Sequence, residues 1–149
     1  MFITYNSHIG KSTYSKAIQI QTGGKFTHTS INLNGVIYEA VIKKGVIRTE
    51  EKDWDSSTIY SSTTFNIDVH THRVLKYWLE AQVGKGYDYW GILSFVWKFI
   101  KQKKGKWWCS ELGTETLAKQ FSLYHYKHKQ DPTEFYYMVQ TIYKVTTDH

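Results

Sequence analysis

Cys109, the single cysteine of this 149-residue chain, lies in the segment KKGKWWCSEL, after two tryptophans and at the start of a predicted helix. A free cysteine is most often a small buried hydrophobic residue. At a helix N-terminus, however, unpaired backbone N–H groups and the positive end of the helix dipole favour the thiolate, which is the nucleophilic form. Two interpretations therefore stand, core packing and nucleophilic catalysis, and the second requires a nearby base.

A predicted hairpin upstream carries the candidate base. The dipeptide Asn34-Gly35 separates the predicted strands FTHTSINL and VIYEAVI. An Asn-Gly pair is the strongest short-range hairpin signal, because both positions of such a turn need positive φ. A two-residue turn of this kind pairs Leu33 with Val36 and thereby fixes the register of both strands.

The register of this hairpin brings a histidine and a carboxylate together. It sets Ser30 opposite Glu39 and His28 opposite Val41, and side chains alternate between faces with a period of two. His28 and Glu39 are then diagonal neighbours on one face, where a carboxylate can reach an imidazole. A solvated cross-strand pair is the plain interpretation, and a base with its orienting acid is the catalytic one.

The elements that must position these residues alternate between helical and strand signals. Ser12 and Gly23 are cap signals around a predicted helix over residues 12–22. Helical spacing predicts a second helix over residues 71–83, with one face formed by Val74, Tyr77, Trp78 and Ala81. Further predicted elements are a strand at STTFNIDV, a helix from Asp88 to Ile100, a helix at CSELGTETLAKQF beginning at Cys109, and a β-rich tail at FYYMVQTIYKVTT. Because the strands are grouped rather than alternating singly with helices, the pattern indicates an α+β fold.

Several of these segments resemble the circularly permuted papain-like amidases, the YiiX-like branch of the NlpC-type cysteine peptidase superfamily. STYSKAIQIQTGGKFTHTSINLNGVIYEAV carries a Ser-x-x-Ser-x-Ala-Ile helix and a His-x-x-Ile strand followed by a Tyr-Glu-Ala strand. GKGYDYWGILSF and WWCSEL look like the family's Gly-Lys-x-Tyr-Asp segment and its Cys-Ser-Glu-Leu helix start, and DPTEF resembles its later proline-containing segment. These blocks follow the family's order and cover most of the chain.

The resemblance implies a permuted papain-like fold, with an antiparallel sheet packed against helices and the nucleophile at a helix N-terminus. Histidine precedes cysteine here, as in the related lecithin retinol acyltransferase-like enzymes. Carried over by position, the resemblance makes Cys109 the nucleophile, His28 the general base and then acid, and Glu39 the group that orients the imidazole. Residues 52–73 match no part of the family pattern.

Three further residues are candidate oxyanion or substrate contacts: Ser110, Tyr87 and Trp108. Backbone N–H groups at the start of the Cys109 helix are candidate oxyanion donors. A tyrosine precedes the cysteine in related unpermuted enzymes, but the spacing from Tyr87 is longer here, and packing is the alternative. Trp107 and Trp108 are expected to pack the approach to the helix against the core, and the alternative is that one of them lines an apolar acyl pocket.

Length and composition predict one globular domain over residues 1–149. Hydrophobic residues make up 41% and aromatic residues 17% of the chain, which suits a packed core rather than disorder. One cysteine cannot form an internal disulfide, and the N-terminal segment MFITYNSHIGKSTYSK lacks the pattern of a signal peptide. We therefore expect a cytoplasmic protein of the producing cell, and the composition also suits a phage protein that acts in its host.

The charged residues suggest two weaker hypotheses. The net charge of +6 is concentrated in residues 98–106, KFIKQKKGK, which read as a solvated turn. A nucleic-acid-binding protein that uses Lys101, Lys103, Lys104 and Lys106 is the minor alternative. His70-x-His72 and His125-x-x-His128 have spacings that suit a metal but no ligand of a second type nearby, so we expect no metal and no cofactor.

The sequence thus predicts a cysteine hydrolase or acyltransferase that cleaves an amide or ester bond through a thioester acyl-enzyme. The substrate classes left open are peptidoglycan peptide amides, lipid or fatty-acyl esters and amides, and acyl or isopeptide groups on proteins. Lys98 interrupts the longest apolar stretch, so no transmembrane segment is expected, although peripheral membrane contact stays open. The alternative function is an inert fold that serves as a binding or inhibitory module, and the oligomeric state is left open.

Overall fold

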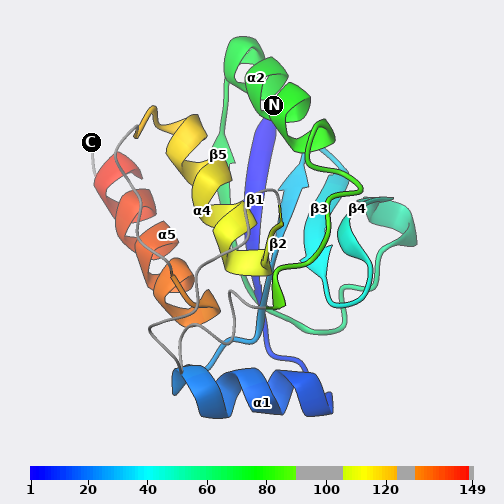
Figure 1. Cartoon of the computed structure of the whole chain (residues 1–149). Coiled ribbons are helices and arrows are strands. Elements are labelled where there is room, and N and C mark those ends of the chain that lie inside the picture. The colour runs from blue at the N-terminus through cyan, green and yellow to red at the C-terminus, as the bar shows by residue number, and fades with distance from the viewer. Residues whose placement is uncertain (90–105, 124–129, 148–149) are drawn as a thin grey trace.

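A computed structural model describes residues 1–89, 106–123 and 130–147 and has an α+β architecture (Figure 1). The strands are β1 (Phe2–His8), β2 (His28–Leu33), β3 (Val36–Val41), β4 (Gly45–Glu50) and β5 (Ile59–Asn66). The described helices are α1 (Thr13–Thr22), α2 (Val69–Glu80), α4 (Cys109–Gln120) and α5 (Pro132–Thr147), with a short 3-10 turn, η1 (Glu51–Asp53). The helix expected from Asp88 to Ile100 falls almost entirely outside the described residues.

All neighbouring strands of the sheet are antiparallel, in the order β4-β3-β2-β1-β5. The predicted hairpin is confirmed, because Asn34 and Gly35 have φ values of 52° and 92°, and Leu33 pairs with Val36. Two strands that the sequence patterns did not predict complete the sheet. β1 lies in its centre between β2 and β5, and β4 forms one edge.

One face of the sheet carries the apolar core. Alternate residues of β1, β2 and β3 pack there against helices α2, α4 and α5, which share that side of the sheet (Figure 1). The sheet and the helices contribute the fully buried side chains Ile3, Ile31, Tyr38, Leu75, Leu79, Leu112, Leu117 and Phe135. Burial of each such aliphatic or aromatic side chain stabilises the fold by about 1.5–3 kcal/mol.

The close contact between α4 and α5 depends on a glycine. A Cβ atom at Gly113 would lie 2.8 Å from the ring of Phe135, so a larger residue would force the two helices apart. This contact helps to fix the position of α4, whose first residue is Cys109.

The β-rich tail predicted at residues 135–147 is wrong, because that segment belongs to α5. Its β-branched and aromatic residues favour strands in general, but Phe135, Met138, Val139 and Ile142 recur at helical spacing and pack on the core. The helix start is also encoded locally. Asp131 accepts hydrogen bonds from the backbone N–H groups of Thr133 and Glu134, and the Glu134 side chain accepts from Asp131 N–H. This reciprocal cap and the proline at the first helical position outweigh the strand composition.

Helix α2 begins earlier and buries a different face than predicted. Asp68 caps it by accepting the Thr71 N–H at 2.8 Å, so the helix spans Val69–Glu80 rather than residues 71–83. Its fully buried residues are Leu75 and Leu79, whereas Tyr77, expected on the packed face, is 82% exposed. The predicted strand at STTFNIDV likewise lies earlier, as β5.

Helix α1 lies across the end of the sheet where β1 finishes and β2 begins (Figure 1). Its predicted caps are confirmed, since Ser12 accepts the Ser15 N–H and Gly23 adopts a left-handed conformation. None of its residues is buried. No helix among the described residues has the length and apolar character needed to cross a bilayer.

Candidate active site

Cys109 is the first residue of α4 and is 4% exposed, which confirms the predicted helix start. The preceding Trp108 is extended and gives no side-chain cap to the helix. The first backbone hydrogen bond into α4 runs from Leu112 N–H to the Trp108 carbonyl. The thiol is therefore attached to the turn whose N–H groups have no carbonyl partner within the helix, at the positive end of its dipole.

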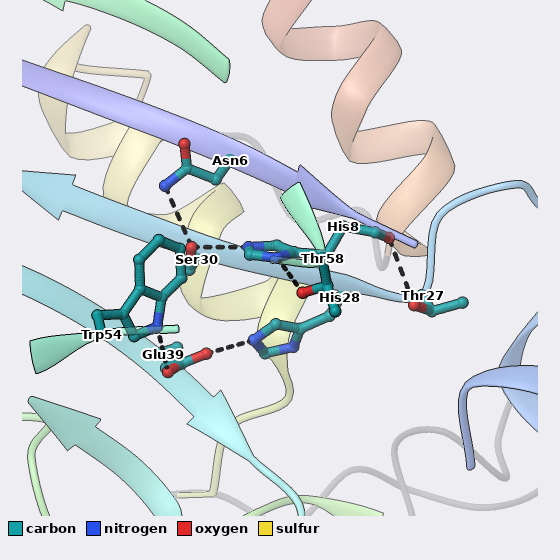
Figure 2. Close-up of polar contacts among 8 residues, drawn as sticks. All are labelled: Asn6, His8, Thr27, His28, Ser30, Glu39, Trp54 and Thr58. Carbon is teal, nitrogen blue, oxygen red and sulfur yellow. Dashed lines mark hydrogen bonds and ion pairs between the residues drawn. The ribbon is translucent and has the colours of Figure 1, made fainter. Parts of the chain in front are cut away.

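His28 and Glu39 form a direct pair, as the hairpin register predicted. His28 Nε2–H donates to Glu39 Oε2 at 2.6 Å (Figure 2). The ladder between β2 and β3 comprises the three pairs nearest the turn, ending at Ile31 and Tyr38. The two side chains thus join the strands beyond the last ladder pair, at the end of the sheet that α1 crosses.

Cys109 is the second residue whose side chain acts on the pKa of His28. Burial lowers the pKa of His28, but the nearby Cys109, the hydrogen bond to Glu39 and the attraction of their charges raise the pKa to about 10. Burial likewise raises the pKa of Glu39, and the hydrogen bond and charge of His28 outweigh it and hold that pKa below its usual range. The arrangement therefore favours an imidazolium at His28 that is paired with the Glu39 carboxylate.

A second histidine, His8, lies beside this pair and was not predicted as a site residue. It is the cross-strand partner of His28 in the β1–β2 ladder, and the two ring centroids are 5.2 Å apart. Its Nδ1 lies 3.0 Å from Thr58 Oγ1 and its Nε2 lies 2.9 Å from Ser30 Oγ (Figure 2). Burial, together with the nearby charge of His28, lowers the pKa of His8 to about 3. His8 is thus a neutral histidine held by hydroxyl groups.

Ser30, one of the two hydroxyl partners of His8, belongs to a row of hydrogen-bonded polar side chains that extends across β2, β1 and β5. Asn6 Nδ2–H donates to Ser30 Oγ at 3.2 Å, and Ser62 donates to Asn6 Oδ1 at 2.7 Å. The sequence contains a signal for this row of polar residues, because apolar and polar residues alternate along β1. Ile3 and Tyr5 are apolar, whereas Thr4, Asn6 and His8 are polar and share the opposite face of the strand.

Trp54 supplies the second hydrogen bond to Glu39. It belongs to residues 52–73, the segment that matches no part of the family pattern. Its indole Nε1–H donates to Glu39 Oε1 at 3.0 Å, and its ring meets His8 edge-on at 5.5 Å between centroids (Figure 2). Both oxygens of Glu39 therefore have a donor. No local signal in the sequence identifies this contact, because it depends on how the loop after η1 folds back over β3.

The remaining predicted contact residues take different positions. Ser110 is fully buried and its hydroxyl donates to the Gln130 carbonyl at 2.6 Å, so its side chain links α4 to the residues before α5. Trp108 is 3% exposed within the core. Tyr87 is 5% exposed and lines a cavity beside His28 and Glu39, and burial, with a smaller effect of the Cys109 charge, raises its pKa.

No protein-family model matches this chain, and no curated protein matches it. Backbone hydrogen bonds from Trp107 N–H to the Gly86 carbonyl, and from Asp88 N–H to the Trp107 carbonyl, tie the strand-like approach of α4 to Tyr87. Trp107 also packs edge-on against Trp78. These contacts fix the residues that lead directly into Cys109.

The weaker sequence hypotheses concern other parts of the chain. His70 and His72 lie on α2, and the described residues contain no group of three or more histidine, cysteine or acidic side chains that could hold a metal. His125 and His128 lie outside the described residues, as do Lys101, Lys103 and Lys104 of the basic segment.

Proposed function

We propose that this chain is a cysteine hydrolase or acyltransferase with a permuted papain-like fold, as its resemblance to the YiiX-like enzymes implies. One observation carries the proposal. The imidazole of His28 is hydrogen-bonded to the carboxylate of Glu39 at 2.6 Å, and Cys109, at the start of α4, is near enough to raise the pKa of that imidazole. A nucleophile, a base and a group that orients the base are the parts that acyl transfer through a covalent intermediate requires.

The reaction would proceed in two steps. The Cys109 thiolate attacks the carbonyl carbon of an amide or ester, and the N–H groups at the start of α4 are candidates to bind the oxygen as it gains charge. The carbon–nitrogen or carbon–oxygen bond then breaks, His28 transfers its proton to the departing amine or alcohol, and a thioester to Cys109 remains. Water or another acceptor gives a proton to His28 and attacks the thioester, which releases the acyl group and restores the thiolate.

The surrounding residues suit these roles. Glu39 and Trp54 together fix the plane of the His28 ring, because Glu39 accepts from both. His8 stays neutral beside it, so that no second positive charge competes for the thiolate. General acid–base catalysis by a histidine held in this manner typically accelerates a reaction by about 10² to 10⁴.

Trapping of the acyl-enzyme tests the proposal. The protein would be incubated with N-acyl amino acids, peptidoglycan fragments and phospholipids, quenched in acid and weighed by intact mass spectrometry, with Cys109→Ala as the control. We expect an acyl adduct that maps to Cys109 with one substrate class and is absent from the variant. A folded protein that gives no adduct with any class would contradict the proposal and favour an inert binding module.

A further inference from the structure

A cavity of about 500 Å³ lies between α1 and the ends of β3 and β4, and His28 and Glu39 form part of its wall. Thr27, Thr58 and His8 line it near the end of β1, and Tyr87 lines it as well. Cys109 is not among the residues that line it. His28 thus faces this cavity, whereas Cys109 lies outside its lining.

This placement determines which part of a substrate the cavity can hold. The group that receives the proton of His28 must lie against the imidazole when the acyl bond breaks. The acyl carbon, by contrast, must lie against the sulfur of Cys109. A cavity that His28 lines and Cys109 does not line is therefore suited to the departing group, or to the acceptor that attacks the thioester in reverse, rather than to the acyl chain.

The lining of the cavity indicates the chemistry of that group. Apolar side chains come from helix α1, from strands β3 and β4 and from the turn between these strands, namely Tyr14, Ile18, Val41, Ile47 and Ile42. Lys44, from the β3–β4 turn, adds a cation that has no ion pair among the described residues. Among the described lining residues outside the His28–Glu39 pair, the other charged one is Asp55, whose carboxylate accepts the Ser57 N–H of its own loop at 2.9 Å.

Resting on the proposed function, we infer that this cavity binds the leaving group or acceptor of the reaction, and that this group has an apolar body with an anionic end. The apolar body would lie against Ile18 and Ile47, and the anionic end would meet Lys44 at the rim. An amino acid or short peptide with a free carboxylate has this chemistry, and so does the phosphate-bearing part of a lipid.

Competition between acceptors tests this inference. p-Nitrophenyl acetate would acetylate Cys109 and release p-nitrophenol, and leucine or leucinamide would then compete with water for the thioester. Attack by the amine gives the N-acetyl product and returns the thiol, so the ratio of N-acetyl product to acetate measures how well each acceptor is held. Each acceptor is compared with itself in wild type, Lys44→Gln and Lys43→Gln, so differences in amine basicity cancel. Lys43 is the matched control, since it is the neighbouring exposed residue in the same turn and does not line the cavity.

We expect Lys44→Gln to lower the capture ratio of leucine about five-fold, the size of one partly exposed charge pair, with leucinamide unchanged. Lys43→Gln should leave both ratios unchanged. Ile18→Asn should lower capture of both acceptors without separating them. Equal capture ratios in wild type and all three variants would overturn the assignment while leaving the acyl-enzyme itself intact.

A binding measurement keeps the inference falsifiable if no acyl-enzyme forms. Hexanoate and hexanol would be titrated into the wild-type protein while the Trp54 indole N–H resonance is followed by NMR, because Trp54 lines the cavity and contacts Glu39. Hexanoate should bind more tightly than hexanol, and Lys44→Gln should remove the difference. That result without acetylation of Cys109 would support the ligand class and contradict the catalytic role, whereas no shift with either probe would overturn the cavity assignment.

Discussion

His8 and His28 face each other across β1 and β2, with ring centroids 5.2 Å apart, but their surroundings favour a neutral ring at His8 and a charged ring at His28. His8 is 2% exposed and bonded to two hydroxyl groups, and burial is the main cause that lowers its pKa to about 3. His28 is bonded to a carboxylate and lies beside the thiol, and its pKa is raised to about 10. The type of partner, rather than the type of residue, decides which ring is charged.

The difference has an electrostatic reason. Two imidazolium ions at this separation would repel each other by about 3 kcal/mol at an effective dielectric constant of 20. A neutral His8 therefore permits a charged His28 beside it. The neighbouring hydroxyls of Ser30 and Thr58 can satisfy a neutral ring without adding charge.

The largest expected effect comes from removing the charge of Glu39, so that His28, like His8, is bonded to a neutral side chain. Glu39→Gln keeps an oxygen that can accept from His28 Nε2–H but removes the negative charge. The pKa of His28 should fall and less thiolate should be paired with imidazolium, so alkylation of Cys109 by iodoacetamide at pH 6 should slow by about a hundredfold. Glu50→Gln, at an exposed carboxylate that pairs with Arg48, is the matched control and should have no effect. Equal alkylation rates in Glu39→Gln and wild type would show that Glu39 does not contribute to activation of the thiol.

A second, smaller effect concerns stability, because the two histidines give opposite pH dependences. The folded-state pKa of His8 lies below its unfolded value, so its contribution is present above about pH 6.5 and is lost as the pH falls, by about 1.4 kcal/mol per pH unit. The pKa of His28 is raised, so its contribution is present below about pH 6.5 and is lost as the pH rises toward 10. Urea unfolding between pH 5 and 9 would measure both slopes. His8→Gln should flatten the acid side alone and His28→Gln the alkaline side alone, and variants with unchanged slopes would contradict the two assignments.

Trp54→Phe gives the smallest expected effect and tests the support of Glu39. The substitution removes one hydrogen bond to the carboxylate but keeps an aromatic ring beside His8. We expect a loss of about 1 kcal/mol in unfolding free energy and a fall of a few-fold in the alkylation rate at pH 6. An alkylation rate equal to that of wild type, with the same loss of stability, would mean that Trp54 only covers the site.

Local chemistry explains which features the sequence could predict. The Asn34-Gly35 turn, the caps of α1 and the start of α4 at Cys109 each depend on a few adjacent residues, and the His28–Glu39 pair follows from the turn by alternation. The His8 contacts depend instead on the pairing of β1 with β2, which are separated by α1, and the Trp54 contact depends on a loop. Helix α5 differs again, because its β-branched and aromatic composition favours a strand, whereas the helical spacing of its apolar residues and its N-terminal cap decide the structure.

If His28 activates Cys109, the rate at which iodoacetamide carboxamidomethylates the folded protein at pH 6 should show it. Wild type, His28→Gln and urea-unfolded protein would be treated with iodoacetamide and followed by intact mass. We predict that folded wild type reacts at least about thirtyfold faster than the unfolded protein, whose thiol has an ordinary pKa near 8.5, and that His28→Gln loses this advantage. Folded wild type that reacts no faster than His28→Gln or the unfolded chain would contradict the account.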